Sequence, residues 1–256
     1  RNIDFVIHSA ALKHVPAAEY NPFECIHTNV LGAENVVNAA IRAGVKKVLA
    51  LSTDKAASPV NLYGASKLAS DKIFVAANHL CPPEGPRFSV VRYGNVVGSR
   101  GSVVPFFQKL IAEGAASLPI TDPRMTRFWI TLNQSVEFVL TSLDQMSGAE
   151  IFIPKIPSMK ITDLAACMAP NLPTHVVGIR PGEKLHEVMI TEDDARTTVD
   201  AGDRYVIKPA FKEWAAKEDN WPEAPPVKEG FRYASNSNSD WLDADGLRKM
   251  IEIGES

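Results

Sequence analysis

One segment of the chain, residues 46–67, limits the possible folds more than any other. Lys46 to Leu51 is a short apolar run with high β propensity, as expected of an interior strand of a parallel sheet. A short loop follows, and Asn61 is a residue type preferred at helix N-caps. In open α/β sheets the chemistry lies at the carboxyl ends of the strands. The segment therefore predicts an α/β fold with a site that begins at residues 53–55.

Tyr63 and Lys67 are four residues apart on the predicted helix, so their side chains share one face. A lysine ammonium near a phenol favours the phenolate, because opposite charge stabilises the ionised form. The pair therefore predicts a general base that works near neutral pH. The same spacing is also ordinary on solvated helix faces. Its place after a strand and a Ser-Thr-Asp-Lys loop, with Tyr93-Gly-Asn-Val one strand further on, favours the catalytic interpretation.

The composition excludes several functional classes. The 256 residues, 45% hydrophobic and 22% charged, suit one or two ordinary domains with a sizeable core. A net charge of −3 and scattered basic residues argue against a nucleic-acid partner. Cys25, Cys81 and Cys167 lack metal-ligand spacing, so we predict reduced thiols and no metal site. The sequence has neither a membrane-spanning apolar run nor a signal peptide, which predicts a cytoplasmic protein without a membrane partner.

Five segments carry a specific resemblance, and they are His8–Pro16, Ser52–Ala56, Asn61–Lys67, Val91–Pro105 and Arg180–Glu187. In these segments the chain resembles the extended short-chain dehydrogenase/reductase superfamily, and within it the inverting UDP-N-acetylglucosamine 4,6-dehydratases. The similarity covers nearly the whole chain and thins after about Pro209. Retaining sugar dehydratases typically carry Glu where this chain has Lys55, and larger membrane-anchored relatives typically carry Met where it has Tyr63.

The resemblance implies a nucleotide-sugar 4,6-dehydratase. Such an enzyme oxidises C4 transiently, eliminates water, returns hydride to C6 and inverts C5, giving a UDP-2-acetamido-2,6-dideoxy-4-keto-hexose of the L-arabino series. By resemblance Tyr63, assisted by Lys67, removes the 4-hydroxyl proton. Lys55 then takes the C5 proton, Asp54 protonates the leaving 6-hydroxyl, and Thr53 completes the catalytic group. Lys55 must be neutral and Asp54 protonated, which burial favours; Lys67 is a further source of charge that would favour neutral Lys55.

The resemblance implies NADP as the cofactor, with NAD as the alternative. The chain lacks the Gly-x-Gly-x-x-Gly loop that seats a pyrophosphate in a complete dinucleotide fold, and it opens on a predicted strand, Ile3–Ala10, without an initiator Met. The resemblance therefore implies that three further strands, roughly 70–80 residues, are missing from the start. By resemblance the cofactor contacts are Ser9, Ala10, Ala11, Asn29, Ser52, Tyr63, Lys67 and Val96. Tight packing explains the small residues 9–11 equally well, and Asn29 is either a prop for the catalytic loop or a helix-surface residue.

A UDP-sugar is the implied substrate. By resemblance its contacts are Lys13, Lys55, Tyr63, Asn95, Arg100, Gly101, Ser102, Val103, Val104, Arg180 and Glu183. A cation and free backbone donors before a helix that begins near Val103 suit a diphosphate, and the planar fork of Arg180 suits a pyrophosphate. The plain alternatives are a solvated loop lysine for Lys13, a linker for residues 98–102 and a surface ion pair for the Arg180–Glu183 turn. We assign no catalytic role to His186.

We predict a Rossmann-like doubly wound parallel sheet, with a smaller C-terminal α/β substrate-binding lid. Residues 1–108 are expected to form the C-terminal part of the cofactor-binding domain, and residues 109–256 mostly the lid and a polar tail. The predicted helices are Asn21–Ala43 with Gly44 as its cap, Asn61–Leu80, Asn133–Met146 and Asp243–Ile253. The predicted strands after residue 51 are Arg87–Tyr93, Leu118–Ile120, Phe128–Ile130 and Glu150–Ile153, the last three in the lid.

Two other functions stay open. A nucleotide-sugar epimerase of the same fold would exchange the C4 configuration without losing water. A truncated chain could instead bind UDP-sugar or partners without turnover. The resemblance also implies a homo-oligomer, a hexamer in this family, and a place in flagellin glycosylation and pseudaminic acid synthesis.

Overall fold

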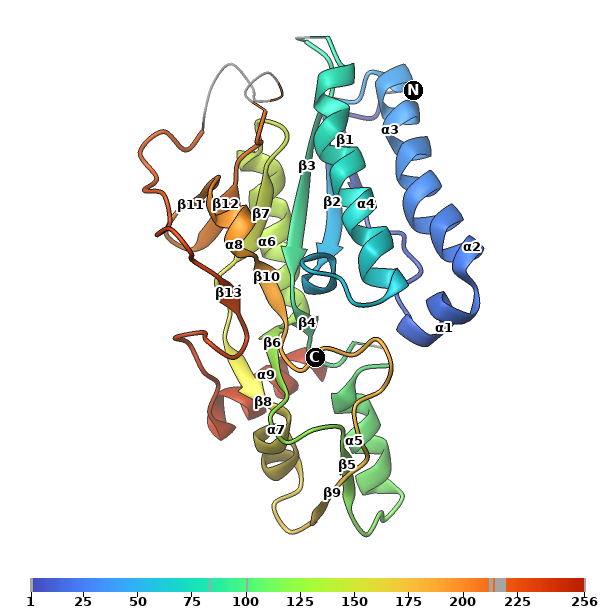
Figure 1. The fold of residues 1–256 in the computed structure, drawn as a ribbon, viewed down its shortest axis with the longest axis vertical. Helices are drawn as coiled ribbons and strands as arrows, with labels where there is room; N and C mark the ends of the chain where they lie inside the picture. Colours follow the sequence, from blue (N-terminus) through green and yellow to red (C-terminus); the bar gives the residue numbers. More distant parts are fainter. Residues whose placement is uncertain (1, 83, 100, 212–213, 215–219, 256) are drawn as a thin grey trace. The chain divides into compact units, whose positions relative to one another are not determined.

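The computed structural model describes residues 2–82, 84–99, 101–211, 214 and 220–255, and Figure 1 shows their fold. The chain forms two compact units that interleave in the sequence. Unit 1 comprises residues 1–93, 138–155 and 188–232, and unit 2 comprises residues 94–137, 156–187 and 233–256. The predicted division, a cofactor-binding part up to residue 108 and a lid beyond it, stays a prediction, because compactness does not show what each unit binds.

Unit 1 is built on a six-stranded sheet with the order β1-β2-β3-β7-β12-β11. The first four strands run parallel, and β12 and β11 extend the sheet with antiparallel pairs. This sheet confirms the predicted parallel α/β fold. The strands of unit 1 are β1 (Phe5–His8), β2 (Lys47–Thr53), β3 (Arg87–Tyr93), β7 (Ile151–Pro154), β10 (Val188–Ile190), β11 (Thr198–Asp200) and β12 (Arg204–Ile207).

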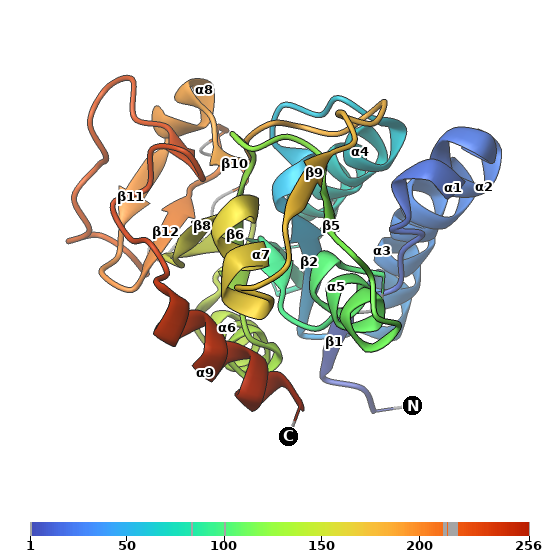
Figure 2. The ribbon, with the colours of Figure 1, turned by 90° about the horizontal axis from the view of Figure 1, so that it is seen from below.

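Helices cover both faces of the parallel strands. Phe88 of β3 packs against Phe74 of α4, with ring centroids 6.4 Å apart. Leu49 and Val91 face the other way and cluster with Phe138 of α6. Successive strand side chains point to opposite faces, so each interior strand fills two cores. Figures 1 and 2 show α3 and α4 on one side of β2 and β3. The helices are α1 (Val15–Tyr20), α2 (Pro22–Ile26), α3 (Gly32–Ala43), α4 (Leu62–Ala77), α6 (Leu132–Gln145, unit 1 from residue 138) and α8 (Glu192–Ala195).

The predicted helix from Asn21 to Ala43 is present but is not uniform. It consists of α2, a π-helical turn at His27–Leu31 and α3. Gly44 ends it with φ 66°, the left-handed conformation predicted for a C-cap. Asn21 stands at the N-cap, but its side-chain amide donates to Ala17 O of the preceding helix α1, which the sequence did not predict.

One strand lies in a different place from the predicted one. The strand predicted at Glu150–Ile153 exists as β7, but it pairs with β3 in the main sheet, so its assignment to the lid is wrong. All four of its residues are buried, as is usual for an interior parallel strand. The sequence does not indicate this pairing, because β7 and β3 are far apart along the chain. Strands β11 and β12, near the region predicted as a polar tail, were also missed.

Unit 2 has a core of its own, in which Trp129, Phe107, Leu118, Leu164 and Leu247 are fully buried. In this unit β6 pairs with β4 and β8, and β5 pairs with β9. No helix in the described part of the chain is long and apolar enough to cross a bilayer. The elements are β4 (Asn95–Val96), α5 (Val103–Ala112), β5 (Leu118–Ile120), β6 (Thr126–Ile130), β8 (Ser158–Lys160), α7 (Ile161–Met168), β9 (Thr174–Val176), β13 (Tyr233–Ala234) and α9 (Ala244–Glu255).

Candidate active site

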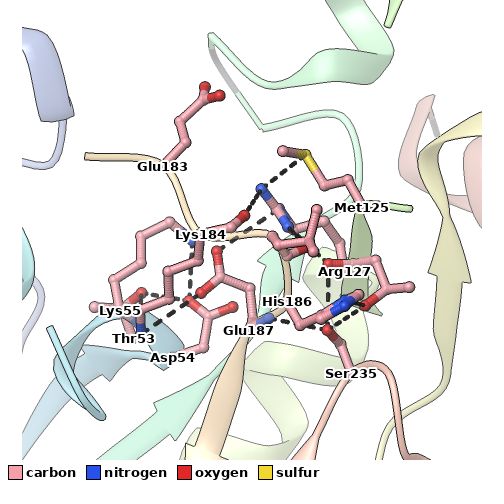
Figure 3. Close-up of polar contacts among 12 residues, drawn as sticks. Thr53, Asp54, Lys55, Met125, Arg127, Glu183, Lys184, His186, Glu187 and Ser235 are labelled. Carbon is pink, nitrogen blue, oxygen red and sulfur yellow. Dashed lines mark hydrogen bonds and ion pairs between the residues drawn. The ribbon is translucent and has the colours of Figure 1, made fainter. Parts of the chain in front are cut away.

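The turn after β2 brings an acid and an amine into contact. β2 ends at Thr53, and residues Asp54–Ala56 form one 3₁₀ turn. Thr53 Oγ1 accepts a hydrogen bond from Lys55 N at 3.3 Å and donates one to Asp54 Oδ1 at 2.9 Å. Lys55 Nζ lies 3.0 Å from the same Asp54 oxygen (Figure 3). The Asp54 side chain is fully buried and that of Lys55 is 24% exposed. The turn therefore fixes the Asp54 carboxyl and leaves Lys55 partly accessible.

Helix α4 begins where the sequence predicts and packs directly on this turn. Asn61 Oδ1 accepts a hydrogen bond from Gly64 N at 2.7 Å, and Glu19 accepts one from Leu62 N at 2.8 Å. A Cβ at Gly64 would overlap the carbonyl oxygen of Lys55. Because glycine has no Cβ, the first turn of α4 can approach the Lys55 backbone closely. The helix that carries Tyr63 is thus held against the turn that carries Asp54 and Lys55.

Tyr63 lies close to three of the predicted catalytic residues. Burial raises the pKa of its phenol to about 12; the charge of Lys55 lowers this pKa, that of Asp54 raises it, and a hydrogen bond with Thr53 lowers it. Burial is thus the largest effect on this pKa, and Lys55 is the cation that opposes it. The prediction that Lys67 favours the phenolate of Tyr63 stays a prediction.

Lys67 lies one turn further along α4 and is buried. Its Nζ donates a hydrogen bond to Leu51 O of β2 at 2.8 Å. Burial lowers the pKa of Lys67, and the nearby carboxylate of Asp71 opposes this effect. The structure thus brings Thr53, Asp54, Lys55 and Tyr63 together. Lys67 lies one turn beyond Tyr63 on α4.

Asn29 ties the loop after β1 to the catalytic helix. Its side chain accepts from Leu12 N at 2.8 Å and donates to Leu12 O at 3.0 Å and to Ser66 Oγ at 2.9 Å. Ser66 Oγ in turn donates to Tyr63 O at 2.8 Å. Asn29 is buried, so the interpretation as a helix-surface residue is wrong. It lies in the π-helical turn, a distortion often found at functional sites, and sequence reasoning did not identify Ser66.

The predicted cofactor contacts of unit 1 occupy one edge of the sheet. Ser9 and Ala10 are exposed directly after β1, and Ala11 is half-buried. β1 and β2 are parallel neighbours, so these residues and Thr53 leave the sheet at the same end. Ser52 is buried, and its hydroxyl donates to Asp71 Oδ2 at 2.9 Å. Lys13 is exposed, and the residue before it, Leu12, is hydrogen-bonded to the Asn29 side chain. Val96 belongs to β4 of unit 2.

The predicted phosphate-binding segment surrounds the start of α5. Gly101 has a φ of 76°, Ser102 is the N-cap residue, and Val103 and Val104 open the helix. Ser102 Oγ is buried and has no hydrogen-bond partner within the described residues. Asn95 is half-buried in β4, opposite Trp129 of β6. Arg100 lies outside the described residues. The helix start therefore has an unused hydroxyl where an anion would be expected.

The Arg180–Glu183 segment is an exposed turn. Glu183 N donates to Arg180 O at 3.1 Å, and Arg180 Nη1 lies 3.8 Å from Glu183 Oε1. The Arg180 side chain is 65% exposed. The structure therefore contains the surface ion pair, and both side chains are accessible to a ligand.

A buried ion pair anchors the chain that follows this turn. Arg127 donates to Lys184 O at 3.0 Å and to Leu185 O at 3.2 Å, and its Nε lies 3.6 Å from Glu187. His186 Nδ1 shares a hydrogen bond with Thr126 Oγ1 at 2.8 Å. Figure 3 shows the Glu183 carboxylate pointing away from this cluster. The sequence offers no signal for Arg127, a single arginine within a short strand. No cluster of His, Cys, Asp and Glu that could hold a metal occurs among the residues described.

A parallel sheet with Thr53, Tyr63 and Lys67 at the carboxyl edge of one interior strand defines the class: the chain has the fold of an extended short-chain dehydrogenase/reductase. The predicted resemblance is confirmed by the comparisons with known proteins. The chain belongs to the polysaccharide biosynthesis protein family, whose family model matches residues 1–209.

Two groups of relatives have names that state an activity. Two inverting UDP-N-acetylglucosamine 4,6-dehydratases of Campylobacter jejuni are each 58% identical to the whole chain, which spans 78% of their length. A UDP-glucose 4-epimerase of Rickettsia akari is 42% identical over 81% of the chain and 62% of its own length. The similarity to the dehydratases is thus both higher and more complete.

Solved structures with the same fold include Pen from Bacillus thuringiensis. It is 36% identical with a TM-score of 0.86, over 99% of this chain and 76% of that one. DesIV, a dTDP-glucose 4,6-dehydratase from Streptomyces venezuelae solved with NAD, is 23% identical with a TM-score of 0.65, over 72% of this chain and 64% of its own. The second similarity supports the fold alone.

Proposed function

We propose that this chain catalyses the 4,6-dehydration of UDP-N-acetylglucosamine with inversion at C5, as a hydro-lyase. The product is a UDP-2-acetamido-2,6-dideoxy-4-keto-hexose of the L-arabino series. Similarity to the Campylobacter dehydratases over the whole chain supports this function. The observation that carries it is the 3.0 Å contact between Lys55 Nζ and Asp54 Oδ1 beside Tyr63. Elimination of water needs a base and an acid in addition to the group that acts on the 4-hydroxyl.

This chemistry needs a nicotinamide cofactor, which when bound accepts hydride from C4 and returns it to C6. The donor set fits the nicotinamide half of such a cofactor, because Tyr63 and Lys67 lie beside the carboxyl end of β2 and the small residues 9–11 follow the parallel strand β1. Asn29 would hold the loop after β1 through Leu12 N, and Ser52 would contact the cofactor or hold Asp71 beside it. We propose NADP, with NAD as the alternative; the structural relative DesIV contains NAD and leaves this choice open.

Tyr63 is assigned the proton of the sugar 4-hydroxyl, with Thr53 as its hydrogen-bond partner. Burial holds its pKa at about 12, so the phenol needs help to act as a base near neutral pH. Lys55 lowers this pKa. A cationic Lys55 therefore favours the first step, and Lys67 holds the helix to β2 through Leu51 O.

Lys55 and Asp54 are assigned the elimination. Lys55 must be neutral to remove the C5 proton, and Asp54 must be protonated to donate to the leaving 6-hydroxyl. Transfer of one proton from Nζ to Oδ1, across their 3.0 Å contact, creates both forms at once without changing the net charge. Once Tyr63 has accepted the substrate proton, no phenolate remains to favour the cation of Lys55. A proton from water then adds to C5 on the face opposite Lys55, which keeps the proton that it removed, and this gives inversion.

Unit 2 and Lys13 are assigned to the UDP-sugar. Ser102 Oγ, which is buried and has no hydrogen-bond partner among the residues that the structure describes, and the start of α5 suit a diphosphate oxygen. By resemblance Arg100, Gly101, Val103 and Val104 contact the same group. Arg180 is accessible and can offer two parallel N–H groups to a phosphate, with Glu183 and Asn95 contacting the rest of the nucleotide sugar.

The test is to incubate the chain with NADP+ and UDP-N-acetylglucosamine and to follow the product by mass spectrometry. We expect a product lighter by one water, and a Lys55→Ala variant that no longer forms it. Lys46→Ala, which removes an exposed lysine of the same unit, is the control and should keep activity. Unchanged dehydration by Lys55→Ala would refute the roles assigned here.

A 4-epimerase is the second candidate, because UDP-glucose 4-epimerases are also relatives of this chain. Epimerisation conserves mass, so a product of unchanged mass with a new C4 configuration would favour it over dehydration. The Lys55–Asp54 contact argues against it, since epimerisation needs no acid for a leaving hydroxyl.

The remaining predictions concern the setting of the enzyme. We propose a homo-oligomer, a hexamer by resemblance, in the cytoplasm, acting in flagellin glycosylation or pseudaminic acid synthesis. Light scattering of the purified chain tests the oligomeric state.

A further inference from the structure

A second polar cluster lies between α4 and the sheet, and the mechanism above does not use it. Asp71 stands on α4, one turn beyond Lys67 and two beyond Tyr63, and its side chain is buried. Ser52 Oγ donates to Asp71 Oδ2 at 2.9 Å, and Arg92 Nη2 lies 3.3 Å from the same oxygen. Ser52 and Arg92 are direct partners in the pairing of β2 with β3. The carboxylate of Asp71 is therefore fixed from the two strands that lead into the catalytic loops.

Arg92 also connects this cluster to a distant part of the chain. Its Nη1 donates to Met189 O of β10 at 2.9 Å and lies 3.6 Å from Asp194 Oδ2 of α8. β10 packs against the Asp54–Ala56 turn. The Arg92 side chain is 3% exposed. One buried guanidinium therefore joins α4, β3 and the strand that supports the turn of the proposed acid and base.

Stability alone does not explain such a cluster. A buried ion pair is on average no more stabilising than well-packed apolar side chains of similar volume. Arg92 Nε is, moreover, buried without a hydrogen-bond partner in the part of the chain described. An unsatisfied buried donor is destabilising. The cluster is therefore better explained by its effect on its neighbours.

The neighbour most affected is Lys67. Burial lowers the pKa of Lys67, and Asp71 is the carboxylate that opposes this. Lys67 also acts on the ring of His8 from β1 and donates to Leu51 O of β2, and Tyr63 stands one turn before it on α4. The cation Arg92 lies 3.3 Å from the Asp71 carboxylate. His8 and Tyr63 are uncharged in their ordinary forms, so neither replaces the negative charge of Asp71.

We propose that Asp71 is a positioning residue for Lys67, and that Ser52 and Arg92 fix the Asp71 carboxylate one helical turn beyond Lys67 on α4. The proposal rests on the proposed function only for the catalytic importance of Lys67. Asp71 keeps the buried lysine cationic and hydrogen-bonded to Leu51 O, and Arg92 couples the same carboxylate to the turn of Asp54 and Lys55.

The first test needs no activity and follows the titration of Lys67 in the chain itself. Lysines labelled with ¹³C at Cε are observed by NMR as a function of pH, and the Lys67 signal is assigned with the Lys67→Arg variant. We expect Lys67 to lose its proton at lower pH in Asp71→Asn than in the unchanged chain. Asp71→Ser is a second charge-removing variant in case the amide variant does not fold. An unshifted Lys67 titration in a folded variant of either kind would overturn the proposal.

Matched variants separate charge from general disturbance. Asp4→Asn removes an exposed carboxylate of the same unit and should leave the Lys67 titration in place. Ser52→Ala keeps the Asp71 charge but removes one of the two groups that hold it, so it should shift the Lys67 titration less than Asp71→Asn does. A shift in Asp4→Asn equal to that in Asp71→Asn would show a general effect of net charge and would count against the proposal.

The second test uses dehydration of UDP-N-acetylglucosamine. Asp71→Asn should lower kcat roughly tenfold with little change in KM, the effect of about 1.4 kcal/mol at the transition state. The alkaline limb of its pH profile should move to lower pH, whereas a merely structural defect lowers activity equally at every pH. An unmoved alkaline limb would contradict the proposal. An inactive unchanged chain would count against the proposed function, while the NMR titration still decides the role of Asp71.

Discussion

The residues assigned to catalysis and those assigned to substrate binding differ sharply in how the fold holds them. Tyr63 is 8% exposed, and the Asp54 and Lys67 side chains are likewise buried, each with contacts to neighbouring side chains or backbone. The Arg180 side chain, by contrast, is 65% exposed, and its Nη1 lies 3.8 Å from Glu183 Oε1. The catalytic groups are thus arranged before substrate arrives, whereas Arg180 can reorient when a ligand offers a better partner.

This difference has an energetic reason. An exposed ion pair contributes little to stability, so exchanging Glu183 for a phosphate as the partner of Arg180 has a small energetic penalty. A catalytic acid and base must be held in place, because a shift of about 1 Å in the site can reduce the rate 10²-fold. Substitutions in the buried region should therefore act on kcat, and substitutions at the exposed turn should act on KM.

The largest expected effect is that of Tyr63→Phe. Removing the phenol deletes the proposed base at the 4-hydroxyl, so kcat should fall about 10²- to 10⁴-fold, the usual contribution of general base catalysis. Steady-state kinetics with UDP-N-acetylglucosamine measure this. Tyr20→Phe, which removes a phenol that is 86% exposed in the same unit, is the matched control and should keep full activity. A kcat within a factor of two of the unchanged chain would remove Tyr63 from the mechanism.

The second-largest effect is expected where the backbone of α4 approaches the Asp54–Lys55 turn, at Gly64. In Gly64→Ala the new Cβ would overlap Lys55 O, so α4 or the Asp54–Lys55 turn must shift. We expect a loss of roughly 1–3 kcal/mol in the free energy of unfolding, together with a lower kcat. Gly32→Ala is the control, since its Cβ would meet its nearest neighbour, His27 O, at an ordinary 3.6 Å. Equal stability of the two variants in urea titrations would show that the close approach of α4 to the turn is unimportant.

The same contrast separates what the sequence could predict from what it could not. The end of β2, the cap at Asn61, the helix of Tyr63 and the left-handed Gly44 all depend on local side-chain and backbone preferences, and the structure confirms them. The pairing of β7 with β3 was missed because it depends on packing between residues about 60 positions apart, for which a short apolar run carries no signal.

The electrostatics of the site were the hardest part to predict. The i, i+4 spacing of Tyr63 and Lys67 correctly placed both on one helix, but it did not indicate that burial has the largest effect on the pKa of Tyr63. Burial raises this pKa, and Lys55, which is eight residues away in sequence, is the cation that lowers it. Ser66 and Asp71 were missed for a similar reason, because a polar residue on a buried helix face looks in sequence like one on an exposed face.

A smaller effect is expected at the exposed turn. Arg180→Ala should raise KM for UDP-N-acetylglucosamine about tenfold, the loss of roughly 1.4 kcal/mol of binding, and should leave kcat within a factor of two. Arg124→Ala removes another exposed arginine of unit 2, paired with Asp122, and should change neither value. A drop in kcat with unchanged KM in Arg180→Ala would break the proposed contrast between the two regions.

The smallest effect tests the buried region through stability alone. Burial, and then the charge of Lys67, lower the pKa of His8 below its ordinary value of 6.5. As pH falls below about 6.5, His8 of the unfolded chain binds a proton that folded His8 does not yet accept. His8 therefore lowers the free energy of unfolding as the pH decreases, by at most about 1.4 kcal/mol per pH unit. In His8→Gln the free energy of unfolding from urea titrations should therefore decline less steeply between pH 7 and pH 5. The difference between the two chains at pH 8, where imidazole is neutral in both states, measures the lost packing on Phe74 and serves as the internal control. Parallel pH curves for the two chains would mean that folded His8 accepts its proton as readily as the unfolded chain does. Burial and the charge of Lys67 would then not lower the pKa of His8.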